Sequence, residues 1–302
     1  MRSLELAIKY LAGNRLQGTA AERTALTTGT DTMGVNDATA SNISDTTFVA
    51  AGDTGGVAMP SGLGLKSYYF DGNDAFQCND IKDFPASSGT VGTISVWYYN
   101  TGDQESKQIL AFGDANANQY LSFQTRESGD DKIVIHHRDT SGTNWEIRNA
   151  GSLSTSAWHH AVASQNGTTV VCYVDGVELT SWNDQTDKSA WIESGIDRFR
   201  VGCSNHNNAG DASFITGNVT EVAFWNVALT EAQVQSLYGN GGSTAKKANT
   251  ELTGLRAYFD GSSLNNAAVI VYPNLPDGSI FEESDTGTHY MWDGVRAWNE
   301  MS

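Results

Sequence analysis

Tight-turn signals repeat along this chain, each at the end of a short apolar or aromatic run. Two such runs lie between Trp158 and Gly176; they are joined at Asn166-Gly167, and the second closes on Asp175-Gly176. An Asp-Gly pair favours the primed turns that connect the strands of β-hairpins. Related endings follow at Tyr69-Phe70-Asp71-Gly72, Tyr258-Phe259-Asp260-Gly261 and Met291-Trp292-Asp293-Gly294. Together these signals predict antiparallel β structure, in which loops at the ends of the sheets can carry binding residues.

Strand-like runs fill the region from residue 62 to residue 227. They are short, rich in β-branched and aromatic residues, and separated by turns of Gly, Asp and Asn. The predicted strands are Lys66–Phe70, Ala75–Cys78, Gly92–Tyr99, Gln108–Gly113, Tyr120–Thr125, Lys132–His137, Asn144–Arg148, His159–Ser164, Thr169–Val174, Arg198–Gly202 and Gly217–Trp225. So many short strands indicate a mainly β protein, a two-sheet antiparallel jelly-roll sandwich.

One helix is expected to close this region. Thr230 and Gln233 match a capping box, with Leu229 and Val234 at the hydrophobic-staple positions. The glycine-rich run 239–242 then ends the helix after Tyr238. The jelly-roll domain is therefore predicted over 61–242.

The N-terminal region has a different pattern. Leu4, Ile8 and Leu11 share one face of a predicted short helix over 3–12. A capping box at Thr19-Ala20-Ala21-Glu22 predicts a second short helix over 19–27, and the polar segment that follows is typical of a linker. Residues 1–60 are therefore expected to form a helical arm and linker.

The C-terminal region, 243–302, is predicted to be a linker followed by a small β-meander. Its expected strands are Ala268–Tyr272, Ser279–Glu283, Thr288–Trp292 and Arg296–Asn299. A three-stranded meander is near the minimum size for stability, so we expect it to pack on something larger.

Charge excludes some partners. The chain has 18 basic and 35 acidic residues, a net charge of −17, so no nucleic-acid binding is expected. No apolar run approaches the ~20 residues that span a bilayer, so membrane insertion is not expected. Glu5 and Lys9 interrupt any N-terminal apolar run, so no secretion signal is expected. Cys172 lies in an apolar run typical of a core, whereas a Cys78–Cys203 bridge is left open.

A family resemblance rests on several blocks of residues. They occur in the order Phe70-Asp71-Gly72, Gly92–Trp97, Trp158–Val162, Tyr173–Gly176, Arg200–Gly202, Gly217–Asn226 and Ala228–Tyr238. Over about residues 66–238 the chain resembles the laminin-G-like, concanavalin A-like jelly-roll family. The resemblance implies a two-sheet sandwich that binds carbohydrate or protein, often with calcium at its rim.

The segment from Leu275 to Asn299 resembles a terminal module of phage and archaeal-virus structural proteins. This implies a virion-surface protein, a capsid decoration or tail component. It would bind other virion subunits, as a homo-oligomer or within a large assembly, and a host-surface glycan or protein. The alternative is a host-encoded lectin or adhesin, extracellular or at the cell surface.

A glycoside hydrolase on the same fold is a further alternative. Some such enzymes carry acids spaced as E-x-D-x-x-E on one strand, where alternation points all three at the substrate. Here the pattern occurs only as Glu283-Ser284-Asp285, with Thr288 in the third position and a predicted turn between. We therefore expect no catalytic residues and no enzymatic activity.

Two sets of residues are the candidate sites. Carbohydrate binding uses aromatic faces beside amide and carboxylate groups. The candidates are Trp182, Trp191, Asn205, His206, Asn207 and Asn208. Calcium requires converging oxygen ligands, for which the candidates are Asp71, Asp74 and Asp211; the alternative is that these are ordinary turn residues. The pairs His136-His137 and His159-His160 are not expected to bind metal, because adjacent strand residues point to opposite faces.

Overall fold

The computed structural model describes residues 9–11, 15–18, 39–41, 48–78, 90–102, 104–126, 131–192, 195–239, 244–251, 254–261, 280–283, 285–292 and 298–301. The chain forms two compact units. One combines Met1–Gly34 with Ala268–Ser302, and the other spans Val35–Ala267. The larger unit thus extends beyond both ends of the domain expected over 61–242.

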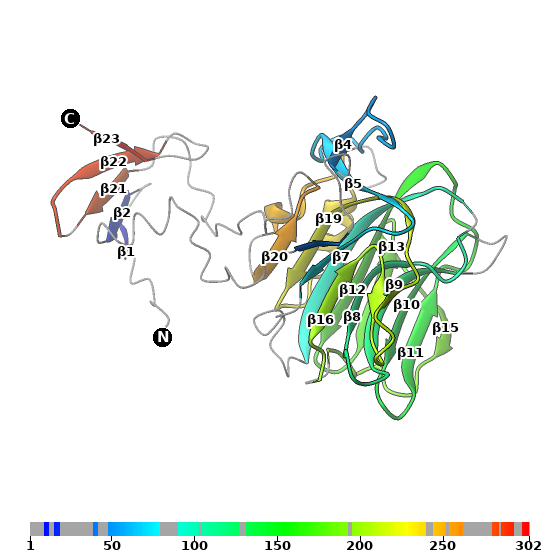
Figure 1. The fold of residues 1–302 in the computed structure, drawn as a ribbon. Helices are drawn as coiled ribbons and strands as arrows, with labels where there is room; N and C mark the ends of the chain where they lie inside the picture. Colours follow the sequence, from blue (N-terminus) through cyan, green and yellow to red (C-terminus); the bar gives the residue numbers. More distant parts are fainter. Residues whose placement is uncertain are drawn as a thin grey trace. The chain divides into compact units, whose positions relative to one another are not determined.

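The first of two large sheets in this unit has eight strands (Figure 1). In spatial order they are β15 (Ser181–Asp184), β11 (Thr143–Arg148), β10 (Lys132–Arg138), β9 (Tyr120–Arg126), β8 (Gln108–Gly113), β16 (Arg198–Val201), β6 (Ala75–Cys78) and β3 (Thr39–Ser41). All neighbouring pairs are antiparallel.

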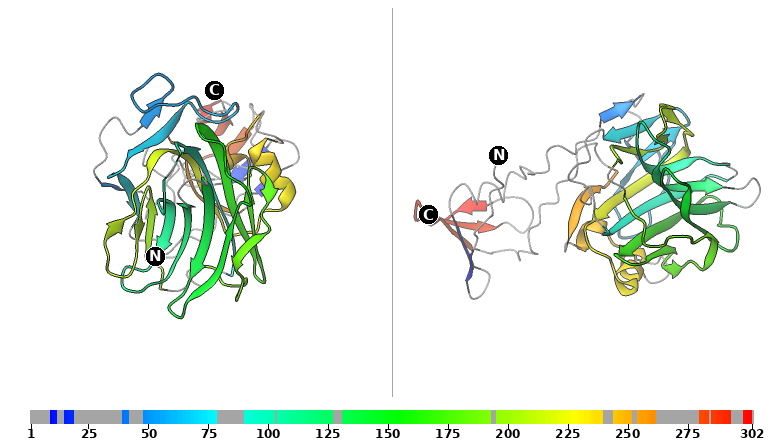
Figure 2. Two further views of the ribbon diagram at one scale, coloured as in Figure 1. Left: turned by 90° about the vertical axis from the view of Figure 1, so that its right-hand side faces the viewer. Right: turned by 90° about the horizontal axis from the view of Figure 1, so that it is seen from below.

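The second sheet faces the first (Figure 2). Its strands are, in order, β14 (Val177–Glu178), β13 (Val170–Val174), β12 (Ala157–Asn166), β7 (Val91–Asn100), β19 (Thr216–Trp225), β5 (Lys66–Asp71) and β4 (Phe48–Ala50), with β20 (Leu255–Phe259) also paired to β19. Residues from both sheets, such as Ile133, Ile135, Val96 and Phe224, form one buried cluster. The predicted sandwich, including its eleven strands, is confirmed.

Helix α2 (Glu231–Tyr238) begins and ends where the sequence predicts. The Thr230 side chain accepts from the Gln233 amide, and the Gln233 side chain accepts from the Thr230 amide, which completes the capping box. Gly239 follows in the left-handed conformation, with φ 88°. The ring of Tyr238 stacks on Trp97 of β7 at 5.8 Å, so the helix packs on the outer face of the second sheet.

Two short segments complete the larger unit. β17 (Ser204–Asn205) and β18 (Asp211–Ala212) form a hairpin. The 3-10 turn η2 (Ala248–Thr250) precedes β20. Cys172 and Cys203 are free and buried, so Cys203 does not form the bridge that the sequence left open. None of the described helices has the length and apolar character needed to cross a membrane.

The smaller unit is built from both ends of the chain. Its sheet has the order β1 (Lys9–Leu11), β2 (Arg15–Gly18), β21 (Ile280–Glu283), β22 (His289–Trp292) and β23 (Trp298–Glu300). The C-terminal meander is confirmed. The predicted helix over 3–12 is wrong at Lys9–Leu11, because β1 pairs with β2 and β2 pairs in parallel with β21.

This pairing is between segments far apart in the sequence, and it outweighs the local helical periodicity of residues 3–12. The second predicted helix, over 19–27, and the predicted strand Ala268–Tyr272 lie outside the described residues.

Candidate functional site

The outer face of the first sheet, turned away from the second sheet, is polar. On β10, Ile133 and Ile135 belong to the core, whereas His136 and Arg138 alternate with the core residues and point outward. On β9, Tyr120 lies directly opposite Arg138, and Ser122 lies opposite His136. Alternation in two neighbouring strands therefore gathers polar side chains on one surface.

Glu146 of β11 organises part of this surface. Its Oε2 accepts a hydrogen bond from Arg126 Nη1 at 3.0 Å, and its Oε1 accepts one from Asn183 Nδ2 at 2.5 Å. His136 Nδ1 lies 3.9 Å from Glu146 Oε2 and 3.3 Å from the Tyr120 hydroxyl. These contacts join strands β9, β10, β11 and β15.

The rim loop after β17 contributes His206. Its ring lies 4.6 Å from that of Tyr120, whose other ring neighbour, His136, is at 5.0 Å in an edge-on arrangement. The outer-face cluster consists of Tyr120, Arg126, His136, Arg138, Glu146 and His206. Tyr120 and His206 are half-buried, whereas His136 and Glu146 are buried.

The titration of the cluster follows from this burial. Burial lowers the pKa of His136 to about 4, with nearby Arg126 and Arg138 acting in the same direction and Glu146 opposing them. Burial and Arg138 also lower the pKa of His206. Both imidazoles are therefore neutral near pH 7. The two ring nitrogens of His136 are hydrogen-bonded to the hydroxyls of Tyr120 and Thr143, at 3.3 Å and 3.2 Å.

The four predicted rim residues lie together in one loop. The backbone N–H of Asn207 donates to the carbonyls of Asp114 and Ala117, and Asn208 donates to Ala115 and Asn116. Asn205 donates to Asp211 at 2.7 Å. The rim loop is thus fixed to the β8–β9 loop, and this attachment places His206 against Tyr120.

The predicted tryptophans lie elsewhere. Trp191 is 3% exposed within the core, so the prediction of an accessible indole is wrong: this ring fills the interior. Trp182 is packed partly against the core, and Lys188 Nζ lies 4.1 Å from its ring centroid. Neither ring belongs to the outer-face cluster.

The predicted calcium ligands are engaged in local contacts. Asp74 is buried and accepts from the Asp71 amide, while Asp71 accepts from the Asn73 amide. Asp211 accepts from Arg200 Nε at 2.8 Å. Among the described residues, no three His, Cys, Asp or Glu side chains group to hold a metal ion. Calcium binding by these aspartates stays a prediction.

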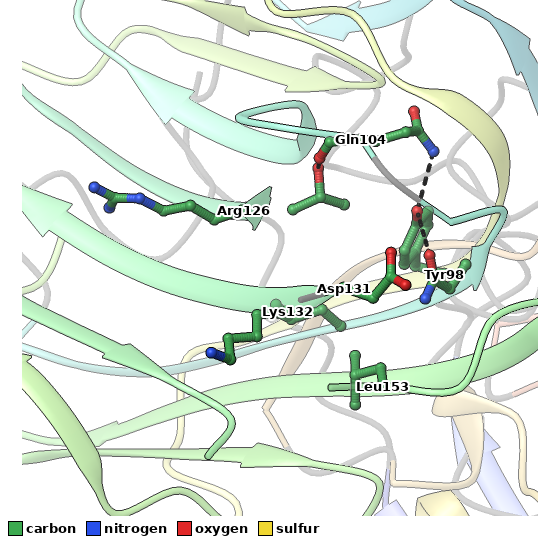
Figure 3. Close-up of a pocket in the computed structure, with 9 residues that line it drawn as sticks. Tyr98, Gln104, Arg126, Asp131, Lys132 and Leu153 are labelled. Carbon is green, nitrogen blue, oxygen red and sulfur yellow. Dashed lines mark hydrogen bonds between the residues drawn. The ribbon is translucent and has the colours of Figure 1, made fainter. Parts of the chain in front are cut away.

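A small pocket opens at one end of the sandwich (Figure 3). Its lining includes Tyr98, Gln104, Asp131 and Leu153, and Gln104 Nε2 donates to the Tyr98 hydroxyl at 3.2 Å. Its volume of about 10 Å³ suits one water molecule and no sugar ring. The candidate site is therefore the face of the sheet.

Sequence reasoning missed most of the outer-face cluster, although a signal was present. Every second residue of β9 from Tyr120 to Arg126 is polar or Tyr, the same holds on β10 except at Val134, and both strands end on an arginine. Alternation predicts that these residues share a face. That Tyr120, Arg138 and His206 lie together follows only from the pairing of β9 with β10 and from the position of the rim loop.

Comparisons with known proteins agree with this architecture. The family model described as the concanavalin A-like lectin/glucanases superfamily matches residues 70–235. No curated protein matches the chain.

Solved structures are similar at low sequence identity. Domain 4 of AbnA, a GH43 extracellular arabinanase from Geobacillus stearothermophilus, in complex with arabinotriose, is 18% identical, with a TM-score of 0.46 over 65% of this chain and 85% of that one. A heptameric SAP-like pentraxin from Limulus polyphemus is 14% identical, with a TM-score of 0.46 over 65% and 91%.

The CBM40 of Ruminococcus gnavus IT-sialidase, bound to alpha2,3 sialyllactose, is 13% identical, with a TM-score of 0.46 over 57% of this chain and 96% of that one. The family match covers more than half of the chain and coincides with the sandwich. This chain belongs to the concanavalin A-like lectin/glucanases superfamily.

Proposed function

We propose that this protein is a non-enzymatic carbohydrate-binding protein whose glycan lies on the outer-face cluster. The observation that carries the proposal is the meeting of a half-exposed aromatic ring, Tyr120, with neutral imidazoles and charged hydrogen-bonding groups on one face. Sugar recognition needs this combination, because a pyranose has apolar C–H faces and a rim of hydroxyls.

Two buried polar atoms on the same face support the proposal. Ser122 Oγ and Gln108 Oε1 are buried and have no hydrogen-bond partner. Ser122 lies opposite His136, and Gln108 lies opposite Gln124, so both belong to the outward-facing rows of β8 and β9. Buried polar atoms are normally satisfied, and because these two are closed off from the surface, water held beneath a bound ligand can supply the missing partners.

The carboxylates of this face support binding without hydrolysis. A glycosidase needs one carboxylic acid that stays protonated and one carboxylate. Glu146 and Asp184 lie opposite each other on β11 and β15. Both oxygens of Glu146 already accept hydrogen bonds. Hydrogen bonds from the Thr186 amide and hydroxyl lower the pKa of Asp184, so this group stays ionised at neutral pH.

A glycan array that contains neutral, carboxylated and sulfated oligosaccharides tests the proposal. The intact protein should bind a subset, and Tyr120→Ala should weaken that binding about tenfold or more because it removes the aromatic surface. Tyr99→Ala is the control, since Tyr99 is also half-buried but packs on Trp158 of the second sheet. Binding of no glycan, or equal loss in both variants, would contradict the proposal.

Absence of hydrolysis is measured in the same preparation. Incubation with each bound oligosaccharide should release no reducing ends. If release occurs and Glu146→Gln abolishes it, the protein is a glycoside hydrolase.

We propose further that the protein is displayed on a virion, as a capsid decoration or tail component, with the sandwich facing the host. Two observations support this. The first is the resemblance of Leu275–Asn299 to virus structural modules, which is a prediction from the sequence alone. The second is that the two ends of the chain form a unit separate from the sandwich. Purified native particles should contain this chain. Its absence from particles and presence on the surface of the producing cell would favour the host-encoded lectin.

A further inference from the structure

Arginines are distributed unevenly in the larger unit. Of its six arginines, five lie on strands of the first sheet: Arg126, Arg138, Arg148, Arg198 and Arg200. Each of the five alternates with core residues, for example Arg200 between Phe199 and Val201, so all five point to the outer face. The larger unit of this acidic chain thus places five of its six guanidinium groups on one surface.

Arg126, Arg198 and Arg200 each have a carboxylate partner. Arg126 pairs with Glu146 at 3.0 Å, Arg198 pairs with Asp197 at 3.0 Å, and Arg200 pairs with Asp211 at 2.8 Å. Arg138 differs. Among the described residues it has no carboxylate within ion-pair distance, and its buried Nε has no hydrogen-bond partner. A half-buried guanidinium without a counterion is costly, so this arrangement calls for an explanation.

The rings beside Arg138 carry no charge. Tyr120 is its direct neighbour across the β9–β10 pair, and His136 precedes it by two residues on the same face. His206 packs against Tyr120. All three rings are uncharged near pH 7, since burial raises the pKa of Tyr120 and lowers those of both histidines. The rings exclude water from the cation without offsetting its charge.

We infer that Arg138 binds the anionic group of an acidic glycan, a carboxylate or a sulfate, on the outer-face cluster. This inference rests on the proposed function and adds the substrate class to it. The guanidinium presents a planar fork that matches a carboxylate or sulfate, and Tyr120 offers apolar surface beside it.

The experiment compares charged glycans with neutralised forms of the same glycans. Oligogalacturonate against its methyl ester tests the carboxylate, and carrageenan oligosaccharide against its desulfated form tests the sulfate. The full-length protein should bind one charged form at least tenfold more tightly than its neutral counterpart. That preference should shrink as salt rises from 50 to 500 mM, because a partly exposed ion pair is screened.

Three variants assign the preference to Arg138. Arg138→Gln should remove it, and Arg138→Lys should keep part of it, because lysine retains the charge without the fork. Lys246→Gln, which removes a positive charge beside α2, is the charge-matched control and should bind as the unaltered protein does. Thermal melts establish that each variant is folded.

The outcomes separate the two proposals. Glycan binding that is lost in Tyr120→Ala but is indifferent to charge would overturn the role of Arg138 and leave the carbohydrate-binding proposal standing. A charge preference that survives in Arg138→Gln would overturn the assignment to this residue. Binding to no glycan, charged or neutral, would overturn both.

Discussion

Glu221 shows how a single residue can carry conflicting constraints in this fold. It lies in β19 at a bulge, with a positive φ of 51°, and only 1% of the residue is exposed. The Tyr258 hydroxyl donates to one carboxylate oxygen at 2.7 Å, and the Ala248 amide donates to the other at 2.8 Å. Glu221 thereby ties η2 and β20 to β19, at the cost of burying an acid in a strained backbone position.

This acid makes stability depend on pH. Burial raises the pKa of Glu221 to about 7, although both hydrogen bonds oppose the shift. The folded state therefore binds this proton more tightly than the unfolded chain does, and Glu221 lowers stability as pH rises from 4.5 to 7. Relative to Glu221→Gln, the unaltered protein should lose on the order of 3 kcal/mol over that range.

Urea denaturation of both proteins at several pH values measures this difference. Glutamine keeps the side-chain shape and can serve both partners, so the variant should fold. Parallel stability curves for the two proteins would show that Glu221 does not titrate in this range.

Among the single elements, α2 begins and ends at residues that cap it. Thr230 is exposed, yet its side chain and that of Gln233 complete a reciprocal capping box. Thr230→Ala should cost about 1 kcal/mol of unfolding free energy, and Thr230→Ser, which keeps the accepting hydroxyl, should cost much less. Denaturant midpoints measure both. Equal stability of the two variants would mean that packing of Tyr238 on Trp97 alone holds the helix.

Elements with strong local signals were predictable from the sequence, and those defined by distant pairing were not. The capping box at Thr230 and the alternation of β10 depend on neighbouring residues, so both could be predicted. The Lys9–Leu11 segment becomes a strand because β2 pairs with β21, more than 260 residues away in the sequence. No local pattern contains that information.

The candidate site was likewise predictable only where its signal was local. His206 was predicted from its polar rim loop, and the structure brings it to Tyr120. Trp191 was predicted to be accessible because it flanks a polar run, but it fills the core. Whether an aromatic ring is exposed depends on which strands lie across from it, and the order β15-β11-β10-β9 is a property of the assembled sheet.

At the scale of the whole molecule, the division of charge is the main functional feature. The chain is strongly acidic, yet five arginines converge on the outer face of the first sheet. The outer face of the second sheet is instead packed by α2 through Tyr238 and Trp97. In the proposed function, recognition belongs to the first sheet, whereas the second sheet packs against the helix.

A crystal structure of the full-length protein with its best-bound oligosaccharide is the most direct test of glycan binding on the outer-face cluster. Sugar density is expected on the outer face of the first sheet, with a ring against Tyr120 and a ligand oxygen within hydrogen-bond distance of the Arg138 guanidinium. Density at Trp182, or on the second sheet, with the outer-face cluster left unchanged, would contradict it.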